Sequence, residues 1–105
     1  RLEITENLAL ENLNGLQSLK YIQESLVIGI NSRKAGNAKL ENIDSLKNLN
    51  NVGGSINITR NFKLLNVKGL IGLTKINDNL TIFINNDMQS FEGLENIREI
   101  KGNVF

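Results

Sequence analysis

The sequence predicts a solenoid, in which successive repeats of the chain stack and their short strands form one parallel sheet. One pattern, with Leu or Ile at its first and third positions, opens at Leu2, Leu26, Ile56 and Leu80, and a fifth copy opens at Val104. The openings follow one another at steps of 24, 30, 24 and 24 residues. Self-similarity at such a period is typical of stacked repeat architectures. The repeats therefore span residues 2–25, 26–55, 56–79 and 80–103.

Each repeat is expected to begin with a short strand. The first and third residues of the four openings are all Leu or Ile, and a strand sends alternate residues to one face. Stacked in register, these segments predict a parallel sheet four or five strands wide.

An Asn follows three residues after the third position of every opening. We interpret these four residues as a structural ladder, because an amide can donate and accept hydrogen bonds at once where the strand bends. The predicted ladder consists of Asn7, Asn31, Asn61 and Asn85.

Beyond the bend, apolar residues recur every three positions, which is neither the helical period of 3.6 nor the strand period of 2. This spacing predicts a second wall of coil or short helical turns, with 3₁₀ segments and a short strand at the final Ile or Val. A small residue precedes one core Leu in each repeat, which indicates a tight turn or close approach between repeats. These residues are Gly15, Ser45, Gly69 and Gly93.

Composition excludes several classes of function. The chain has 105 residues, is 40% apolar, and contains no Cys and no His. Thiol nucleophiles, Ser-His pairs and His/Cys zinc sites are therefore absent, and we expect no metal, no cofactor and no catalytic residue. Glu3 and Glu6 form the only acidic pair on a predicted strand face, with no acid stacked above them, so an enzyme is not predicted.

Charge and hydropathy restrict the partners further. A net charge of +1 with scattered basic residues argues against nucleic acid, and no apolar run is long enough to span a membrane. We expect a single repeat domain or a fragment of a longer array. Its stack ends would either self-associate or continue into further repeats.

The repeat pattern resembles the receptor L-domain family. Leu-x-Ile-x-x-Asn followed by Leu-x-Gly-Leu-x-x-Leu-x-x-Ile is similar to the L-domain repeats of insulin and epidermal-growth-factor receptors. Residues 84–97 look closest to the tandem L-domain repeats of bacterial surface proteins. The resemblance implies a right-handed β-helix-like solenoid of leucine-rich-repeat character, located outside the cell and without enzymatic activity. The chain departs from the receptors in having no cysteine.

Solenoids bind ligands with the outward face of the strand sheet, because outward residues of successive repeats fall into columns. Several of these positions are apolar, as expected for a protein contact surface. The predicted ligand-binding residues are Val27, Ile30, Asn57, Thr59, Arg60, Thr81, Phe83 and Ile84.

The segment 32–39 contains the six extra residues of the second repeat. It is polar and basic, and tolerated drift at a bend is one explanation. The alternative is a loop in which Arg33, Lys34 and Lys39 meet an anionic glycan or acidic protein. Two sequons make Asn57 and Asn79 glycosylation acceptors if the source is eukaryotic.

The functional hypothesis is a non-catalytic recognition module at the cell surface or outside the cell, with its signal and anchor outside this chain. It would bind a protein or glycan through the strand face. A structural spacer or envelope repeat without a specific ligand is the alternative, and an intracellular leucine-rich-repeat scaffold is a third option.

Overall fold

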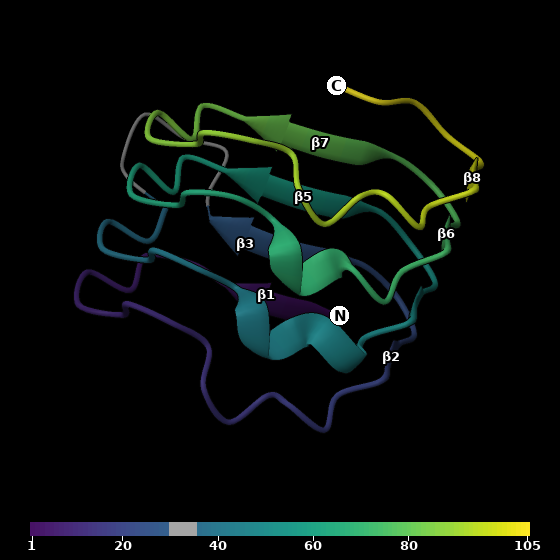
Figure 1. The fold of residues 1–105 in the computed structure, drawn as a ribbon, viewed down its shortest axis with the longest axis horizontal. Helices are drawn as coiled ribbons and strands as arrows, with labels where there is room; N and C mark the ends of the chain where they lie inside the picture. The colour runs from purple at the N-terminus through teal and green to yellow at the C-terminus, as the bar shows by residue number, and fades with distance from the viewer. Residues whose placement is uncertain (30–35) are drawn as a thin grey trace.

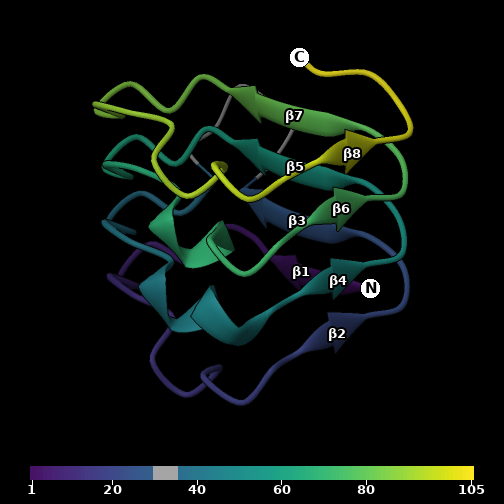
Figure 2. The same cartoon turned by 45° about the vertical axis from the view of Figure 1, so that its right-hand side comes forward.

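Two parallel four-stranded sheets make up the computed structural model, which describes residues 1–29 and 36–105. The first sheet has the order β1 (Leu2–Ile4), β3 (Leu26–Gly29), β5 (Ile56–Thr59) and β7 (Leu80–Phe83). The second has the order β2 (Tyr21–Ile22), β4 (Asn51–Val52), β6 (Lys75–Ile76) and β8 (Glu99–Ile100). Each sequence repeat contributes one strand to each sheet, and Figures 1 and 2 show the strands lying one above another. The predicted parallel sheet is confirmed.

The register of the first sheet places equivalent residues of neighbouring repeats side by side. Leu26 pairs with Leu2 on one side and Ile56 on the other, and Ile56 pairs with Leu80. A slip of one residue would turn every aliphatic side chain outward, so burial of one face fixes this register. The expected fifth strand is present only as an isolated bridge between Leu80 and Val104.

The apolar spacing of three matches backbone hydrogen bonds in which an N–H donates to the carbonyl three residues earlier. The N–H of Leu46 donates to the Ile43 carbonyl at 3.0 Å, and the N–H of Leu49 donates to the Leu46 carbonyl at 2.8 Å. Two 3₁₀ segments result, η1 (Asp44–Asn48) and η2 (Lys68–Leu70), in the second and third repeats. The short strands predicted at the final Ile or Val are confirmed as β2, β4, β6 and β8.

The core is most completely buried in the two central repeats. Leu40, Ile43, Leu46, Leu49 and Val52 are all fully buried, as are the equivalent residues of the third repeat. In the first and last repeats most core residues are only partly buried, because each of these repeats has a neighbour on one side alone. The partly buried set is Leu2, Ile4, Leu10, Leu16, Leu19, Ile82, Met88, Leu94, Ile97 and Ile100.

Small residues allow neighbouring repeats to approach closely, as predicted. A Cβ on Gly69 would lie 1.8 Å from the Ile43 carbonyl oxygen, and one on Gly93 would lie 1.9 Å from that of Val67. In the second repeat the small residue is Ser45, whose Oγ is 3.0 Å from Asn14 Oδ1. Gly15 has open space around it but adopts φ +112°, which explains glycine there.

A ladder of Asn side chains joins the four repeats at the ends of the first-sheet strands. Its members are Asn7, Asn37, Asn61 and Asn85. Each Nδ2 donates to the Oδ1 of the next member, at 3.0, 2.8 and 3.2 Å in chain order. Asn37, Asn61 and Asn85 also donate to the strand carbonyls of Ile4, Ile28 and Ile58 in the preceding repeat.

The second member of this ladder differs from the predicted one. Asn37 fills the position assigned to Asn31, which lies outside the described residues. The N–H of Leu40 donates to the Asn37 carbonyl, as Leu64 does to Asn61 and Met88 to Asn85. The six extra residues therefore fall between Gly29 and Asn37, and Lys39 belongs to the regular part of the repeat.

A second polar column precedes the strands of the first sheet and was not predicted. The backbone N–H groups of Ser55, Asn79 and Asn103 donate to Ser25 Oγ, Ser55 Oγ and Asn79 Oδ1 respectively, at 3.1, 3.3 and 2.8 Å. Both ends of β3 and β5 are thus bonded to a neighbouring repeat through side-chain groups, by hydroxyl oxygens before the strand and by Asn Nδ2 groups at its end. These side chains satisfy backbone groups at the bends that lack a sheet partner.

Candidate recognition surface

The outward face of the first sheet presents three columns of side chains. In the first column, Val27, Asn57 and Thr81 are paired across β3, β5 and β7, and all three are half-buried. Asn57 Oδ1 is enclosed, and no group within residues 1–29 and 36–105 forms a hydrogen bond with it. A buried amide oxygen without a hydrogen bond lowers the free energy of unfolding, so the residues of this column are not selected for stability alone.

The second column contains the main correction to the predicted site. Thr59 is 4% exposed and Gly29 is buried, so neither presents an accessible side chain. A Cβ on Gly29 would lie 1.7 Å from the Thr59 carbonyl oxygen, which shows how closely β3 and β5 approach here. The third member, Phe83, is 58% exposed. Phe83 is therefore the accessible group of this column.

The third column adopts an unusual backbone conformation. Glu6, Arg60 and Ile84 have φ values of 54°, 58° and 55°, in the left-handed region that side chains with a Cβ rarely adopt. Arg60 and Ile84 are both half-buried. Ile84 follows Phe83 in the chain, and the Arg60 N–H donates a hydrogen bond of 3.1 Å to the Phe83 carbonyl. The structure thus brings Arg60, Phe83 and Ile84 together.

The remaining predicted site residues are distributed as follows. Lys39 is exposed, whereas Ile30, Arg33 and Lys34 lie outside the described residues. Of the two sequon residues, Asn57 is half-buried on the strand face. Asn79 directly precedes β7, and its Oδ1 accepts the Asn103 N–H, so its amide takes part in the column that precedes the strands.

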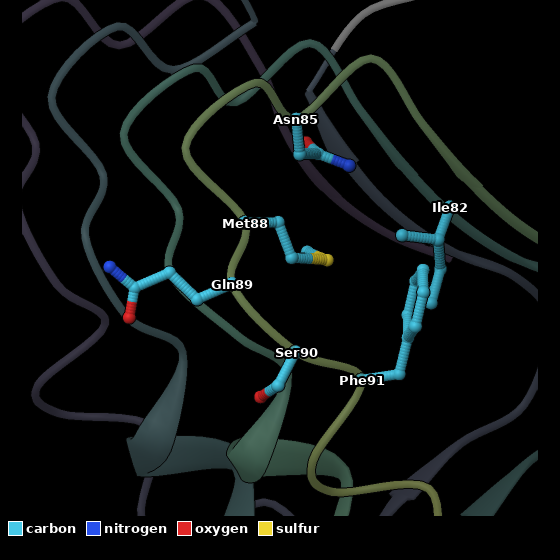
Figure 3. Close-up of a pocket in the computed structure, with 6 residues that line it drawn as sticks. All are labelled: Ile82, Asn85, Met88, Gln89, Ser90 and Phe91. Atoms are coloured by element: carbon cyan, nitrogen blue, oxygen red, sulfur yellow. The ribbon is translucent and has the colours of Figure 1, made fainter.

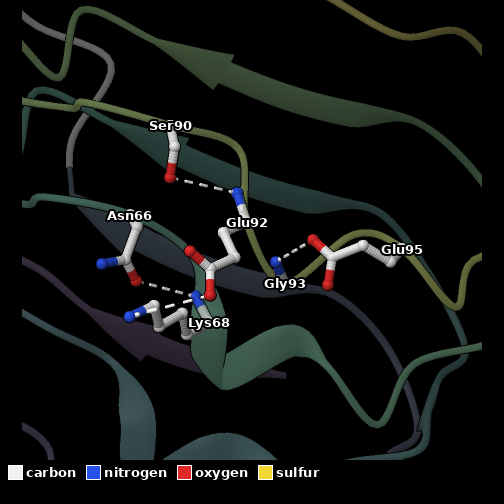
Figure 4. Close-up of polar contacts among 6 residues, drawn as sticks. All are labelled: Asn66, Lys68, Ser90, Glu92, Gly93 and Glu95. Atoms are coloured by element: carbon white, nitrogen blue, oxygen red, sulfur yellow. Dashed lines mark hydrogen bonds and ion pairs between the residues drawn. The ribbon is translucent and has the colours of Figure 1, made fainter.

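Turn-forming side chains account for another regular column that sequence reasoning missed. Asn12, Asn42, Asn66 and Ser90 each accept the N–H of the residue two positions further on. Figure 4 shows two of these turns beside the ion pair of Lys68 and Glu92, at 3.7 Å. They lie next to a cavity of about 190 Å³ lined in part by Ile71 and Glu95. The recurrence of Asn or Ser at the repeat spacing is the sequence signal that would have found them.

Two further hollows lie at the edges of the stacked repeats. One, of about 270 Å³, is lined by Ile82, Asn85, Met88, Gln89, Ser90 and Phe91. Figure 3 shows Ile82, Met88 and Phe91 pointing toward one another, with Gln89 pointing away. The other, of about 290 Å³, lies at the opposite edge and is lined by Arg1, Leu2, Leu16, Leu19, Tyr21, Ile22 and Gln23.

Neither a metal centre nor a membrane-spanning helix is found in residues 1–29 and 36–105. Those residues contain no group of three or more His, Cys, Asp or Glu side chains placed to hold an ion. The same ranges contain no helix with the length and hydropathy needed to cross a bilayer. Glu3, one of the two strand-face acids, forms an exposed ion pair with Arg1 at 3.4 Å.

Comparison of the chain with protein-family models, with curated proteins and with solved structures finds no match.

Proposed function

We propose that the chain is a non-catalytic recognition module, located at the cell surface or outside the cell, that binds a protein or glycan through the outward face of the first sheet. The proposal includes the finer architecture, a right-handed β-helix or leucine-rich-repeat-like solenoid. Strands in equivalent register and two polar columns support this architecture, because every repeat meets its neighbour through the same contacts.

The observation that carries the proposal is the exposure of Phe83 on an ordered strand. The residue is 58% exposed although its strand pairs with β5 through four residues. Exposed aromatic side chains on rigid backbone lose little entropy when they bind, and they are over-represented among the residues that dominate interface energies. Half-buried Thr81 and Arg60 beside it offer hydrogen-bond donors to a ligand.

Backbone strain at Ile84 supports the same surface. A β-branched residue at φ 55° is costly, whereas Gly or Asn at this position would relieve the strain. Retention of an apolar side chain there is explained if Ile84 contacts a ligand together with Phe83.

The test compares Phe83→Ser with Leu8→Ser, a matched control because Leu8 is 70% exposed and lies in a turn outside the strands. Binding is measured on a printed array of defined oligosaccharides and on a panel of purified extracellular protein domains. We expect the wild-type chain and Leu8→Ser to bind the same target, and Phe83→Ser to lose at least about tenfold in affinity. Equal binding by Phe83→Ser, or no binding by the wild type, favours the spacer.

A further inference from the structure

Arg60 differs from the other basic residues of the third repeat in having no acidic partner along the stack. The three lysines of this repeat each form an ion pair with the acid 24 residues later, and they are Lys63, Lys68 and Lys75. The residue 24 positions after Arg60 is Ile84, and the residue 24 positions before it is Gly36. The column of Arg60 therefore offers no carboxylate on either side.

The rest of the chain supplies no counter-ion to Arg60 either. Among residues 1–29 and 36–105, no carboxylate lies within 4.0 Å of its guanidinium group. Residues 30–35 contain no Asp and no Glu. Glu6 has the equivalent position in the first repeat, but β1 and β5 are separated by β3, which places the two residues roughly 10 Å apart at the usual strand spacing. The positive charge of Arg60 is therefore not paired within this chain.

The backbone of Arg60 is held by the repeats on both sides. Its N–H donates to the Phe83 carbonyl at 3.1 Å, and its carbonyl accepts the Gly36 N–H at 2.7 Å. The side chain is half-buried. Because the backbone is already ordered, an anion that binds the guanidinium group does not have to fix it, and partial burial strengthens the attraction between opposite charges relative to open water.

Arg60 also carries the only charge among the described outward residues of β3, β5, β7 and the bends that follow them. The other outward side chains are apolar or neutral: Val27, Asn57, Thr59, Thr81, Phe83 and Ile84. The cores of protein–protein interfaces have the same composition, with Arg and aromatic residues enriched and Lys, Glu and Asp depleted. The face thus presents one cation in uncharged surroundings.

From these observations we propose that the partner of this face is a protein that presents a Glu or Asp carboxylate to Arg60 and an apolar side chain to Phe83 and Ile84. This assignment rests on the proposed function, since it names the partner of the same surface. A planar guanidinium group can donate two parallel hydrogen bonds to one carboxylate. The apolar contact excludes water beside this pair and so strengthens it.

The neighbours of Arg60 favour a protein over an acidic glycan. Each sugar ring carries several hydroxyl groups, and each hydroxyl that is buried in a complex needs a hydrogen-bond partner. Thr59 is 4% exposed, so Asn57 and Thr81 are the neutral polar side chains that remain accessible on the described face, and both are half-buried. Phe83 and Ile84 instead match an apolar side chain next to the acid.

The carboxylate contact is tested by reversing the charge at Arg60. Arg60→Glu is expected to fold, because Glu6 adopts φ 54° at the equivalent position and Arg60 itself has φ 58°. Lys47→Glu is the matched control, since it changes the net charge equally at an exposed residue of η1, outside the strands. Far-UV circular dichroism checks that both variants keep the fold of the wild type.

The probes are blocked hexapeptides in which one central Glu, Gln or Lys is surrounded by apolar residues, and binding is measured by fluorescence anisotropy. We expect the wild type and Lys47→Glu to bind the Glu peptides more tightly than the Gln peptides by about fivefold or more at low salt. Arg60→Glu should lose this preference and bind the Lys peptides more tightly than the Glu peptides. A preference for Glu that Arg60→Glu retains, or that Lys47→Glu loses, overturns the contact with Arg60.

Two further outcomes separate this inference from the proposed function. Wild-type chain that binds oligogalacturonate but none of the Glu peptides at about 1 mM overturns the protein partner in favour of an acidic glycan. If Phe83→Ser loses affinity for the Glu and Gln peptides alike while Arg60→Glu keeps the wild-type ratio between them, the recognition surface stands and the carboxylate contact is wrong. Absence of binding to every peptide also overturns the inference, whereas the proposed function fails only if the oligosaccharide array and the protein domains are not bound either.

Discussion

Asn37 Nδ2 donates a hydrogen bond of 2.8 Å to Asn61 Oδ1, and both side chains are fully buried in the centre of the ladder. Twenty-four residues separate them in the chain, which is the repeat period. Each amide satisfies backbone carbonyls as well as its neighbour, so the ladder links the strand ends of successive repeats. A buried amide network of this kind stabilises a structure only when all of its members are present.

Asn61→Ala should therefore be strongly destabilising. The substitution removes the hydrogen bonds from Asn61 Nδ2 to the Ile28 carbonyl and to Asn85 Oδ1, and it removes the Oδ1 that accepts from Asn37 Nδ2. Each buried group left unsatisfied costs about 1–3 kcal/mol. We expect the free energy of unfolding to fall by roughly 2–4 kcal/mol, measured by urea denaturation followed by circular dichroism. Asn50→Ala is the control, because Asn50 is exposed and only its backbone N–H makes a described hydrogen bond. It should change stability by less than about 0.5 kcal/mol.

The pair Asn37 and Asn61 should be energetically coupled. Because the two side chains share a hydrogen bond, the double variant Asn37→Ala/Asn61→Ala should lose less free energy of unfolding than the sum of the single variants. A coupling of roughly 0.5–3 kcal/mol is expected from a double-mutant cycle. Additive losses within about 0.3 kcal/mol would show that the two amides act separately.

Strand register and core positions could be predicted from the sequence because these positions accept few residue types, mainly Leu, Ile and Val. Leu2, Leu26, Ile56 and Leu80 each open the same alternation of aliphatic residues, and the structure pairs them directly. The column that precedes the strands could not be predicted in the same way. Ser25, Ser55 and Asn79 share a side-chain oxygen rather than an identity, so a search for identical residues misses them.

The second ladder residue was mispredicted because the insertion was placed after the ladder position. Counting forward from Leu26 leads to Asn31, whereas counting back from Leu40 leads to Asn37. Both candidates are Asn, and the hydrogen bonds to Ile4 and Asn61 select Asn37. Burial of Thr59 was also missed, because alternation predicts which face a side chain takes but not how far that face is covered.

Gly69→Ala should be more disruptive than Gly15→Ala. The new Cβ at Gly69 would overlap the Ile43 carbonyl oxygen at 1.8 Å, so the repeats must separate locally, at a cost of about 3 kcal/mol. At Gly15 the space is open and only the positive φ is unfavourable, at about 1–2 kcal/mol. Thermal unfolding of the two variants measures the difference. A larger loss at Gly15 would mean that backbone conformation outweighs close packing.

Ion pairs between the third and fourth repeats should contribute little. Lys63, Lys68 and Lys75 each face an acid 24 residues later, at N···O distances of 3.7 to 4.0 Å, and their side chains are 40–62% exposed. Exposed pairs of this type give about 0–1 kcal/mol. Lys68→Gln should lower the free energy of unfolding by less than about 0.5 kcal/mol, and the loss should vanish in 1 M salt. A loss that persists in high salt would assign a packing role to the Lys68 stem.

Ile84→Asn should show whether the strained backbone at Ile84 lowers the stability of the chain. Asn adopts the left-handed region more readily than a β-branched residue, so relief of strain at φ 55° should raise the free energy of unfolding by about 0.5–1 kcal/mol. Arg60→Asn is the matched control, because Arg60 has φ 58° at the same position of the preceding repeat. Urea denaturation measures both effects. If Ile84→Asn is less stable than the wild type while Arg60→Asn is more stable, the half-buried Ile84 side chain is retained for its packing. Its strain would then no longer support a ligand contact.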